Sequence, residues 1–214
     1  MVYLSRADEL LEKINGLKNS HVKKLVDMRM EEFKQNGGKA SREIFKELCF
    51  CILTANFNAE RSIEIQKKID DGFLTLPISQ LTEELRKLGH RYPQTRARYI
   101  VEARRYADSL KDVISRFKDS SLLREWLTKN IKGIGFKEAS HFLRNIGYSD
   151  LAIIDFHIIN ILSKYGLTDR PKTMTKKKYL EIESILRKIA KLSDISLAEL
   201  DLFLWYLETG KVLK

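Results

Sequence analysis

The stretch KGIGFKEASHFLRNIGYSDLAIIDFHIINIL, residues 132–162, contains the strongest structural pattern in this sequence. Two glycines flank Ile134, apolar residues at helical spacing follow, and Gly147 is placed to end the periodic run. The residues WLTKN close a preceding helix just before the glycines. The pattern predicts a helix, a tight turn and a second helix over about residues 123–147. The apolar face of the second helix is predicted to consist of Ala139, Phe142, Leu143 and Ile146.

The rest of the chain predicts helices and no strands. It has three prolines and ten glycines in 214 residues, and no segment alternates polar and apolar residues with period two. Residues 42–57 are predicted as one helix with an apolar stripe, and residues 95–117 as one long, basic, amphipathic helix. We therefore expect an all-α protein without an obvious linker. The stripe on the first of these helices consists of Ile44, Leu48, Cys51, Ile52 and Ala55.

The charge balance favours a polyanionic partner. The chain has 39 Lys and Arg residues and 29 Asp and Glu residues, which gives a net charge of +10. Nucleic acid is the first candidate and an anionic membrane surface the second, while a merely soluble lysine-rich surface is the simple alternative. No apolar run approaches the roughly 20 residues that cross a bilayer, and the start of the chain lacks the pattern of a signal peptide. We therefore expect an intracellular, cytoplasmic protein.

The cysteines and histidines do not indicate a metal centre. Cys49 and Cys51 are the only cysteines, and both lie in the apolar run LCFCIL, which favours buried thiols. Four cysteines that could hold an iron–sulfur cluster are absent. No zinc-ligand spacing connects the four histidines, which are His21, His90, His141 and His157.

The glycine turn has the features of an anion site. Gly133 and Gly135 permit positive φ and leave backbone N–H groups uncovered at the start of a helix, where a backbone phosphate can bind. Lys132 adds positive charge. A tight turn between two helices without a function is the alternative interpretation, and the net charge of the chain favours DNA.

Lys137 and Asp155 occupy the first turns of successive helices. The positive end of a helix disfavours a charged ammonium, which favours Lys137 as a nucleophilic amine; a solvated lysine or a phosphate contact is the alternative. Asp155 is a strong N-cap candidate, and capping alone would explain it. Beside a lysine, its carboxylate could also take a proton or face a developing cation. The helix after Asp155 is predicted to end at Gly166 and to bury Ile158, Ile159, Leu162 and Tyr165.

The segments KGIGFKEASHFLRNIG and IIDFHI together resemble the helix-hairpin-helix DNA glycosylase superfamily. With RARYIVEAR and the ending WYLETGKVLK, they are most similar to the small archaeal-type 8-oxoguanine DNA glycosylase/AP lyases, over nearly the whole chain. The resemblance implies one all-α helix-hairpin-helix glycosylase unit over residues 1–214, with two helical lobes and the active site in the cleft between them. The iron–sulfur loop and extra N-terminal domain of larger superfamily members are absent, so their base pocket cannot be carried over.

The resemblance also implies roles for the residues already named. Lys137 would attack C1′ of the damaged nucleotide and form a Schiff base, and Asp155 would activate the lysine or stabilise positive charge on the sugar. The backbone of Lys132, Gly133, Ile134 and Gly135 would bind phosphates, helped by a monovalent cation. No cofactor is implied.

The damaged base must leave the stack, so a wedge is needed to fill the duplex. The resemblance places this wedge on two loops, at Asn56 and Phe57 and at Tyr92, Pro93 and Gln94, for which an ordinary polar turn is the alternative.

The resemblance implies base recognition by Lys214 and Trp205. Trp205 and Phe203 could stack on the base or fill the core, and for Phe203 the core is the expectation.

The implied function is excision of 8-oxoguanine from double-stranded DNA through a lysine Schiff base, followed by a nick 3′ to the site by β-elimination. The alternatives are a glycosylase for another lesion, a non-catalytic helix-hairpin-helix DNA-binding module, and a basic helical scaffold. Only an enzyme would use the pair formed by Lys137 and Asp155. Nothing in the sequence requires a dimer, so a monomer is expected.

Overall fold

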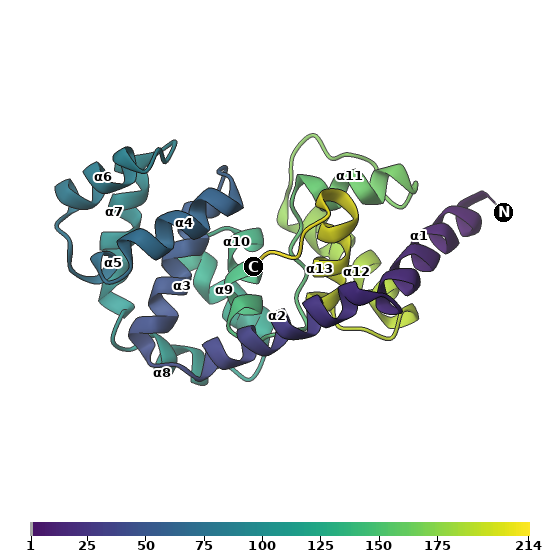
Figure 1. The fold of residues 1–214 in the computed structure, drawn as a ribbon, viewed down its shortest axis with the longest axis horizontal. Helices are drawn as coiled ribbons and strands as arrows, with labels where there is room; N and C mark the ends of the chain where they lie inside the picture. The colour runs from purple at the N-terminus through teal and green to yellow at the C-terminus, as the bar shows by residue number, and fades with distance from the viewer. Residues whose placement is uncertain (1) are drawn as a thin grey trace. The chain divides into compact units, whose positions relative to one another are not determined.

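The computed structural model describes residues 2–214, with side chains from residue 6 onward, and this part of the chain contains helices and no strands (Figure 1). It divides into two compact units. The first consists of the residues up to Lys34 together with Gly147–Lys214, and the second is Gln35–Ile146. The all-α class predicted from the sequence is confirmed.

The first unit is built around α13. Its helices are α1 (Val2–Lys18), most of α2 (His21–Gly38), α11 (Phe156–Lys164), α12 (Lys176–Leu192) and α13 (Leu197–Thr209). Helix α13 packs against α1, α11 and α12, and every side chain from Leu197 to Leu204 except Glu199 is buried. Phe203 is fully buried in a cluster with residues of α2, which confirms the expectation that it fills the core.

The second unit surrounds α3. Its helices are α3 (Ser41–Thr54), α4 (Ala59–Ile69), α5 (Gly72–Thr75), α6 (Ile78–Lys87), α7 (Pro93–Ala103), the 3₁₀ turn η1 (Arg104–Tyr106), α8 (Leu110–Ser115), α9 (Ser120–Asn130) and α10 (Phe136–Asn145). Every α3 residue from Ile44 to Thr54 is buried, so the prediction of a single apolar stripe was too narrow. The reason is that α4, α5, α7, α8 and α10 all pack against α3. Cys49 and Cys51 are buried free thiols, as predicted, and burial raises the pKa of Cys49.

The prediction of one continuous helix over residues 95–117 was wrong. The chain breaks after α7, makes the turn η1, and begins α8 at Leu110. At the break the Arg104 guanidinium donates to the backbone carbonyls of Leu76 at 2.6 Å and Phe73 at 2.7 Å. The break between α7 and α8 is therefore stabilised by residues from another part of the chain. The local sequence has no proline or glycine that would predict it.

No helix in the described part of the chain is both long and apolar enough to span a membrane.

Candidate active site

The glycine turn between α9 and α10 has the predicted helix–turn–helix geometry. Gly133 adopts φ = 82°, a left-handed conformation that other residues rarely adopt. A Cβ atom at this position would lie 2.5 Å from the ring of Tyr99 on α7, so both the backbone angle and the packing require glycine. The apolar face predicted for α10 is buried as expected, from Ala139 to Ile146.

Gly135 corrects one part of the prediction. It is extended, with φ −94° and ψ −172°, so only one of the two glycines uses positive φ. Its amide is also not uncovered, because it donates to Glu138 Oε2 at 3.1 Å. A glycine at the N-cap has no side chain to cap the helix, and the glutamate three residues later supplies the acceptor instead.

Lys137 lies in the first turn of α10, as predicted. Its side chain is 25% exposed, and its Nζ lies 3.4 Å from Oε1 of Glu138. The same carboxylate therefore binds the Gly135 amide through one oxygen and approaches the Lys137 ammonium through the other. Lys132 pairs with Glu102 on α7 at 2.8 Å, and this hydrogen bond lowers the pKa of Glu102. Positive charge at the turn is thus partly balanced by carboxylates within the unit.

The two loops predicted as a wedge are connected through His90. Its Nε2 lies 3.0 Å from the Leu53 carbonyl oxygen, and its Nδ1 accepts from the Tyr92 N–H at 3.1 Å. The ring of Phe57 packs on the imidazole with centroids 4.2 Å apart. This arrangement requires a neutral imidazole protonated on Nε2, and burial lowers the pKa of His90 accordingly. No local pattern around His90 predicted this role.

Arg96 makes a second connection between the same loops. Its guanidinium is buried, donates to the Ala55 carbonyl, and lies 5.9 Å from the ring centroid of Tyr92 and equally far from that of Tyr99. Burial lowers the pKa of Arg96. Asn56, directly after Ala55, is exposed in the left-handed conformation at φ = 57°. A non-glycine residue at this φ is uncommon and often marks a functional turn.

The second wedge loop presents its side chains at the start of α7. Tyr92 is 38% exposed and Gln94 is exposed, while Pro93 occupies the first helical position, where its missing N–H costs no hydrogen bond. All five residues predicted for the wedge therefore lie in the second unit, either between α3 and α4 or at the start of α7, and the hairpin and Lys137 belong to the same unit.

Asp155 caps α11, as predicted. One carboxylate oxygen accepts from the Ile158 N–H at 3.0 Å. Within its own unit the described residues offer the Asp155 carboxylate no other hydrogen bond or ion pair. The buried face predicted for α11 included Ile159, but this side chain is only half-buried. Ile161, which was not predicted, is buried instead.

The extended segment before Asp155 is held by two buried side chains of α12. The hydroxyl of Tyr179 donates to the Ala152 carbonyl at 2.7 Å and accepts from the Ile154 N–H at 3.2 Å. Glu183 accepts from the Ala152 N–H at 3.1 Å. These bonds fix the backbone immediately before Asp155. Sequence reasoning missed both residues, because they look like ordinary helical positions.

An aromatic cluster adjoins Asp155 in the first unit. The exposed ring of Phe156 packs on His157, with centroids 3.8 Å apart, and His157 meets Trp205 edge-on at 4.7 Å. Trp205 is half-buried, and its buried Nε1 has no hydrogen-bond acceptor among the described residues. Lys214 is half-buried at the end of the tail that follows α13. Trp205 thus differs from Phe203 in presenting both exposed surface and an unused donor.

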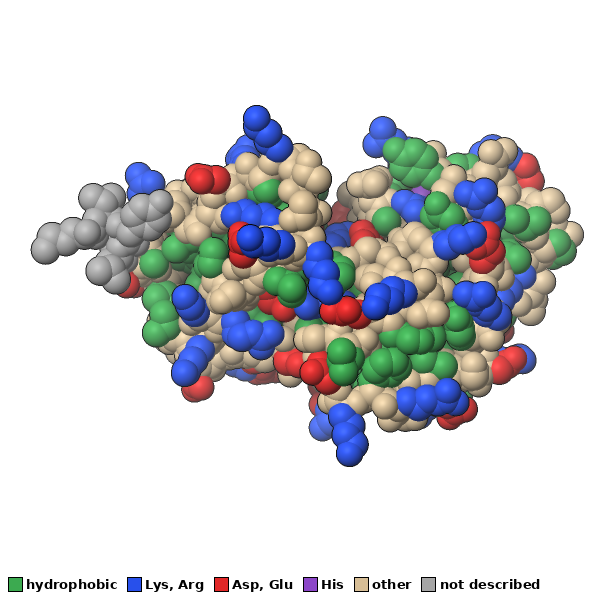
Figure 2. Space-filling model, turned by 180° about the vertical axis from the view of Figure 1, so that it is seen from behind, with side chains coloured by type: hydrophobic (Ala, Val, Ile, Leu, Met, Phe, Trp, Pro, Cys, Tyr) green, Lys and Arg blue, Asp and Glu red, His purple; other side chains and the backbone are tan. Residues whose placement is uncertain are grey.

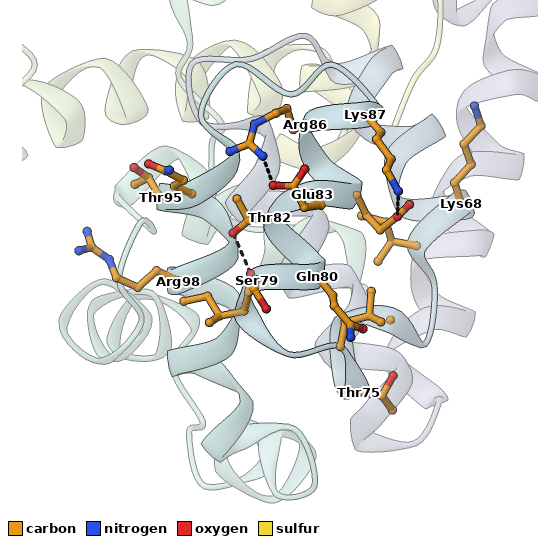
Figure 3. A pocket seen from close by; sticks show the side chains of 16 residues that line it. Lys68, Thr75, Ser79, Gln80, Thr82, Glu83, Arg86, Lys87, Thr95 and Arg98 are labelled. Carbon is orange, nitrogen blue, oxygen red and sulfur yellow. Dashed lines mark hydrogen bonds and ion pairs between the residues drawn. The ribbon is translucent and has the colours of Figure 1, made fainter.

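An open surface groove lies on the second unit, away from Lys137. Figure 3 shows this open groove of about 1250 Å³ along α6, between the end of α4 and the start of α7. Among the predicted site residues it contains only Gln94. Its walls carry ion pairs such as Lys87 with Glu84 at 2.9 Å. The groove therefore has no nucleophile from the predicted set.

The described residues contain no group of three or more His, Cys, Asp or Glu side chains placed to hold a metal ion. The monovalent cation suggested at the hairpin stays a prediction.

Comparisons with known proteins give consistent results over nearly the whole chain. The family model Ogg-HhH, described as 8-oxoguanine DNA glycosylase, matches residues 26–195. The 8-oxoguanine DNA glycosylase/AP lyase of Methanocaldococcus jannaschii is 56% identical over 206 residues, which cover 96% of this chain and 99% of the relative. The protein of the same name from Korarchaeum cryptofilum is 52% identical and covers 97% of this chain and 99% of its own.

Two solved structures resemble this fold closely. The M. jannaschii 8-oxoguanine glycosylase/lyase, in complex with 15mer DNA containing 8-oxoguanine, aligns with a TM-score of 0.94 and 55% identity over 96% of this chain and 100% of that one. The 8-oxoguanine DNA glycosylase of Thermotoga maritima aligns with a TM-score of 0.92 and 47% identity over 97% of this chain and 100% of that one.

Proposed function

Because this chain belongs to the helix-hairpin-helix 8-oxoguanine DNA glycosylase family, we propose that it excises 8-oxoguanine from double-stranded DNA and then cleaves the strand as an AP lyase. The family match confirms the resemblance seen in the sequence motifs. The observation that carries the proposal is identity above 50%, over nearly full length, to relatives named for both activities.

In the proposed first step, the neutral amine of Lys137 attacks C1′ of the damaged nucleotide. The C1′–Nζ bond forms as the bond from C1′ to the base breaks, and the base leaves with the electron pair and takes up a proton. Asp155 accepts a proton from the lysine or faces the positive charge that develops on the sugar. Its cap bond to the Ile158 N–H supports this role, because an ionised carboxylate bound to a backbone amide is held in a fixed direction.

In the proposed second step, the sugar ring opens to a Schiff base between C1′ and Lys137. The imine makes the C2′ proton acidic, so a base can remove it. The electron pair then forms the C2′–C3′ double bond, the C3′–O bond breaks, and the phosphate leaves with the 3′ strand. One lysine thus serves both steps, and side chains supply every reacting group of the protein.

Substrate binding is proposed to use the three loops of the second unit. The backbone of Lys132, Gly133, Ile134 and Gly135 binds phosphate oxygens. The two loops connected by His90 fill the duplex when the base leaves, through Asn56 and Phe57 on one loop and through Tyr92, Pro93 and Gln94 on the other. The exposed, left-handed Asn56 supports this assignment, because a strained exposed turn is preserved only where the surroundings hold it.

Recognition of the oxidised base is proposed to use Trp205 and Lys214. The half-buried indole with an unused Nε1–H can stack on a base or donate to it. Removal of Lys214 should lower the ratio of 8-oxoguanine binding to guanine binding in the same duplex, and an unchanged ratio would exclude Lys214 from base recognition. Both proposed catalytic residues and the hairpin belong to one chain, which supports a monomeric enzyme.

Borohydride trapping tests the proposal. A duplex with a single 8-oxoguanine is incubated with the wild type, with Lys137→Gln, and with Lys129→Gln, which removes an exposed lysine at the end of α9 as a matched control. The wild type and the control should form a covalent complex, and Lys137→Gln should form none while still binding the duplex. Trapping by Lys137→Gln would reject the nucleophile. If the wild type were trapped on another lesion but not on 8-oxoguanine, 8-oxoguanine would be excluded as the substrate. Duplex binding without trapping on any lesion would indicate a non-catalytic module.

A further inference from the structure

The segment from Lys164 to Lys178 has the highest concentration of positive charge in the first unit. It contains six basic side chains and one acidic side chain, Asp169, which amounts to half of the net charge of +10. On the face drawn in Figure 2, by contrast, Lys and Arg side chains are spread over the surface. The glycine hairpin does not account for this segment, because the hairpin belongs to the second unit.

Much of this charge is not neutralised within the protein. Arg170, Lys172 and Lys177 are exposed, and no carboxylate that the structure describes forms an ion pair with any of them. Lys178, by comparison, is half-buried and pairs with Glu181 at 3.5 Å. The exposed cations are therefore available to an external anion.

The last three lysines also occupy an unfavourable position. Helix α12 begins with Lys176, Lys177 and Lys178 and has no acidic residue in its first turn. The partial positive charge of a helix N-terminus repels cations, so this arrangement costs stability in the free protein. An anion bound beside the first turn would offset that cost.

The segment returns to the start of α11. Figure 1 shows the connection after α11 running back along that helix to the beginning of α12. The contact between the Tyr179 hydroxyl and the Ile154 N–H, at 3.2 Å, fixes this arrangement within the unit. Because Tyr179 directly follows the three lysines and Ile154 directly precedes Asp155, the basic segment ends beside the proposed catalytic carboxylate.

We propose that residues 164–178 form a second phosphate-binding surface, which holds the DNA backbone next to the lesion on the unit that carries Asp155. The choice of duplex DNA as its partner rests on the proposed function. The composition of the segment agrees with it, since Met174 is its one exposed large apolar side chain and a membrane surface would favour several. The hairpin and this segment then bind phosphates from separate units.

The test compares two double variants with equal loss of charge. Lys172→Gln with Lys177→Gln removes two exposed cations of the segment, and Lys188→Gln with Lys191→Gln removes two exposed cations near the opposite end of α12. Affinity for an undamaged duplex is measured over a series of salt concentrations. The segment variant should reduce the slope of log affinity against log salt by about 2, since each phosphate contact contributes about 0.9. The control should leave the slope close to that of the wild type.

Two further measurements separate this proposal from its alternatives. A backbone contact carries no sequence information, so the loss of affinity should be equal for damaged and undamaged duplexes. Equal slopes for the two double variants, or a lower excision rate at saturating enzyme with unchanged affinity, would overturn the proposal. Binding to undamaged DNA needs no catalysis, so a failure of the proposed enzyme activity would be recognised separately, from wild-type trapping.

Discussion

Helices α10 and α11 carry the two proposed catalytic residues, and their first turns are stabilised in opposite ways. The N-cap of α10 is a glycine, and the acceptor for its amide is Glu138, a residue of the helix itself. The N-cap of α11 is the carboxylate of Asp155, and the backbone before it is bound by Tyr179 and Glu183 of another helix. At the N-terminus of α10, a phosphate oxygen could therefore replace Glu138 as the anionic acceptor. The N-terminus of α11 holds the Asp155 carboxylate in a fixed position.

The largest effect is expected from Asp155→Asn. Asparagine caps a helix about as well as aspartate, so the melting temperature should change little, while excision should fall by about 100-fold or more because a proton acceptor is lost. Single-turnover excision and thermal melting measure the two effects. Asp155→Ala is the control for the cap and should lose about 1 kcal/mol of stability in addition. A large drop in stability for the Asn variant, with its excision rate preserved, would leave Asp155 as a cap only.

Gly133→Ala should weaken the protein more than the same substitution at a glycine inside a helix. The positive φ costs alanine about 1–2 kcal/mol, and the added Cβ would meet the Tyr99 ring. We expect at least about tenfold weaker duplex binding, measured at fixed salt. Gly16→Ala in α1, where a Cβ meets nothing within 4 Å, should keep wild-type binding and gain about 0.5–1 kcal/mol. Equal binding by both variants would argue against phosphate binding at the hairpin.

Tyr179→Phe tests how firmly the segment before Asp155 is held. The ring remains, but the Ala152 carbonyl and the Ile154 N–H lose their partner in a buried site, which should cost about 1–3 kcal/mol. Excision at saturating enzyme should fall at a temperature where the variant is fully folded. Tyr206→Phe, at a half-buried tyrosine of α13, is the control. An unchanged excision rate for a measurably destabilised Tyr179→Phe protein would show that Asp155 does not depend on this anchor.

The smallest effect is expected from Glu138→Gln. Glutamine can still accept from the Gly135 amide through its side-chain oxygen, but it no longer repels an incoming phosphate. Duplex binding should therefore become tighter by a few-fold, corresponding to about 0.5–1 kcal/mol, as measured by titration at low salt. Weaker binding would mean that the carboxylate supports the hairpin in the bound state and is not exchanged for phosphate.

The local features of the site were predicted from the sequence because they depend on neighbours a few residues away. The cap bond from Asp155 spans three residues, and so does the bond between Gly135 and Glu138. The positive φ at Gly133 and the place of Lys137 in the first turn of α10 are local features of the same kind. Residue identity and spacing determine such interactions, so the pattern GIGFKE followed by IIDFHI was sufficient to place both helix starts and to indicate the family.

Other features were decided only by the tertiary structure. The bond from His90 to the Leu53 carbonyl joins residues 37 apart, that from Arg96 to Ala55 joins residues 41 apart, and that from Tyr179 to Ala152 joins residues 27 apart. The break at Arg104 likewise depends on carbonyls about 30 residues earlier in the chain. The sequence gives the chemistry of these side chains but not their partners. Folding brings the partners together, because buried backbone carbonyls and amides must find hydrogen bonds wherever the packing of the helices leaves them.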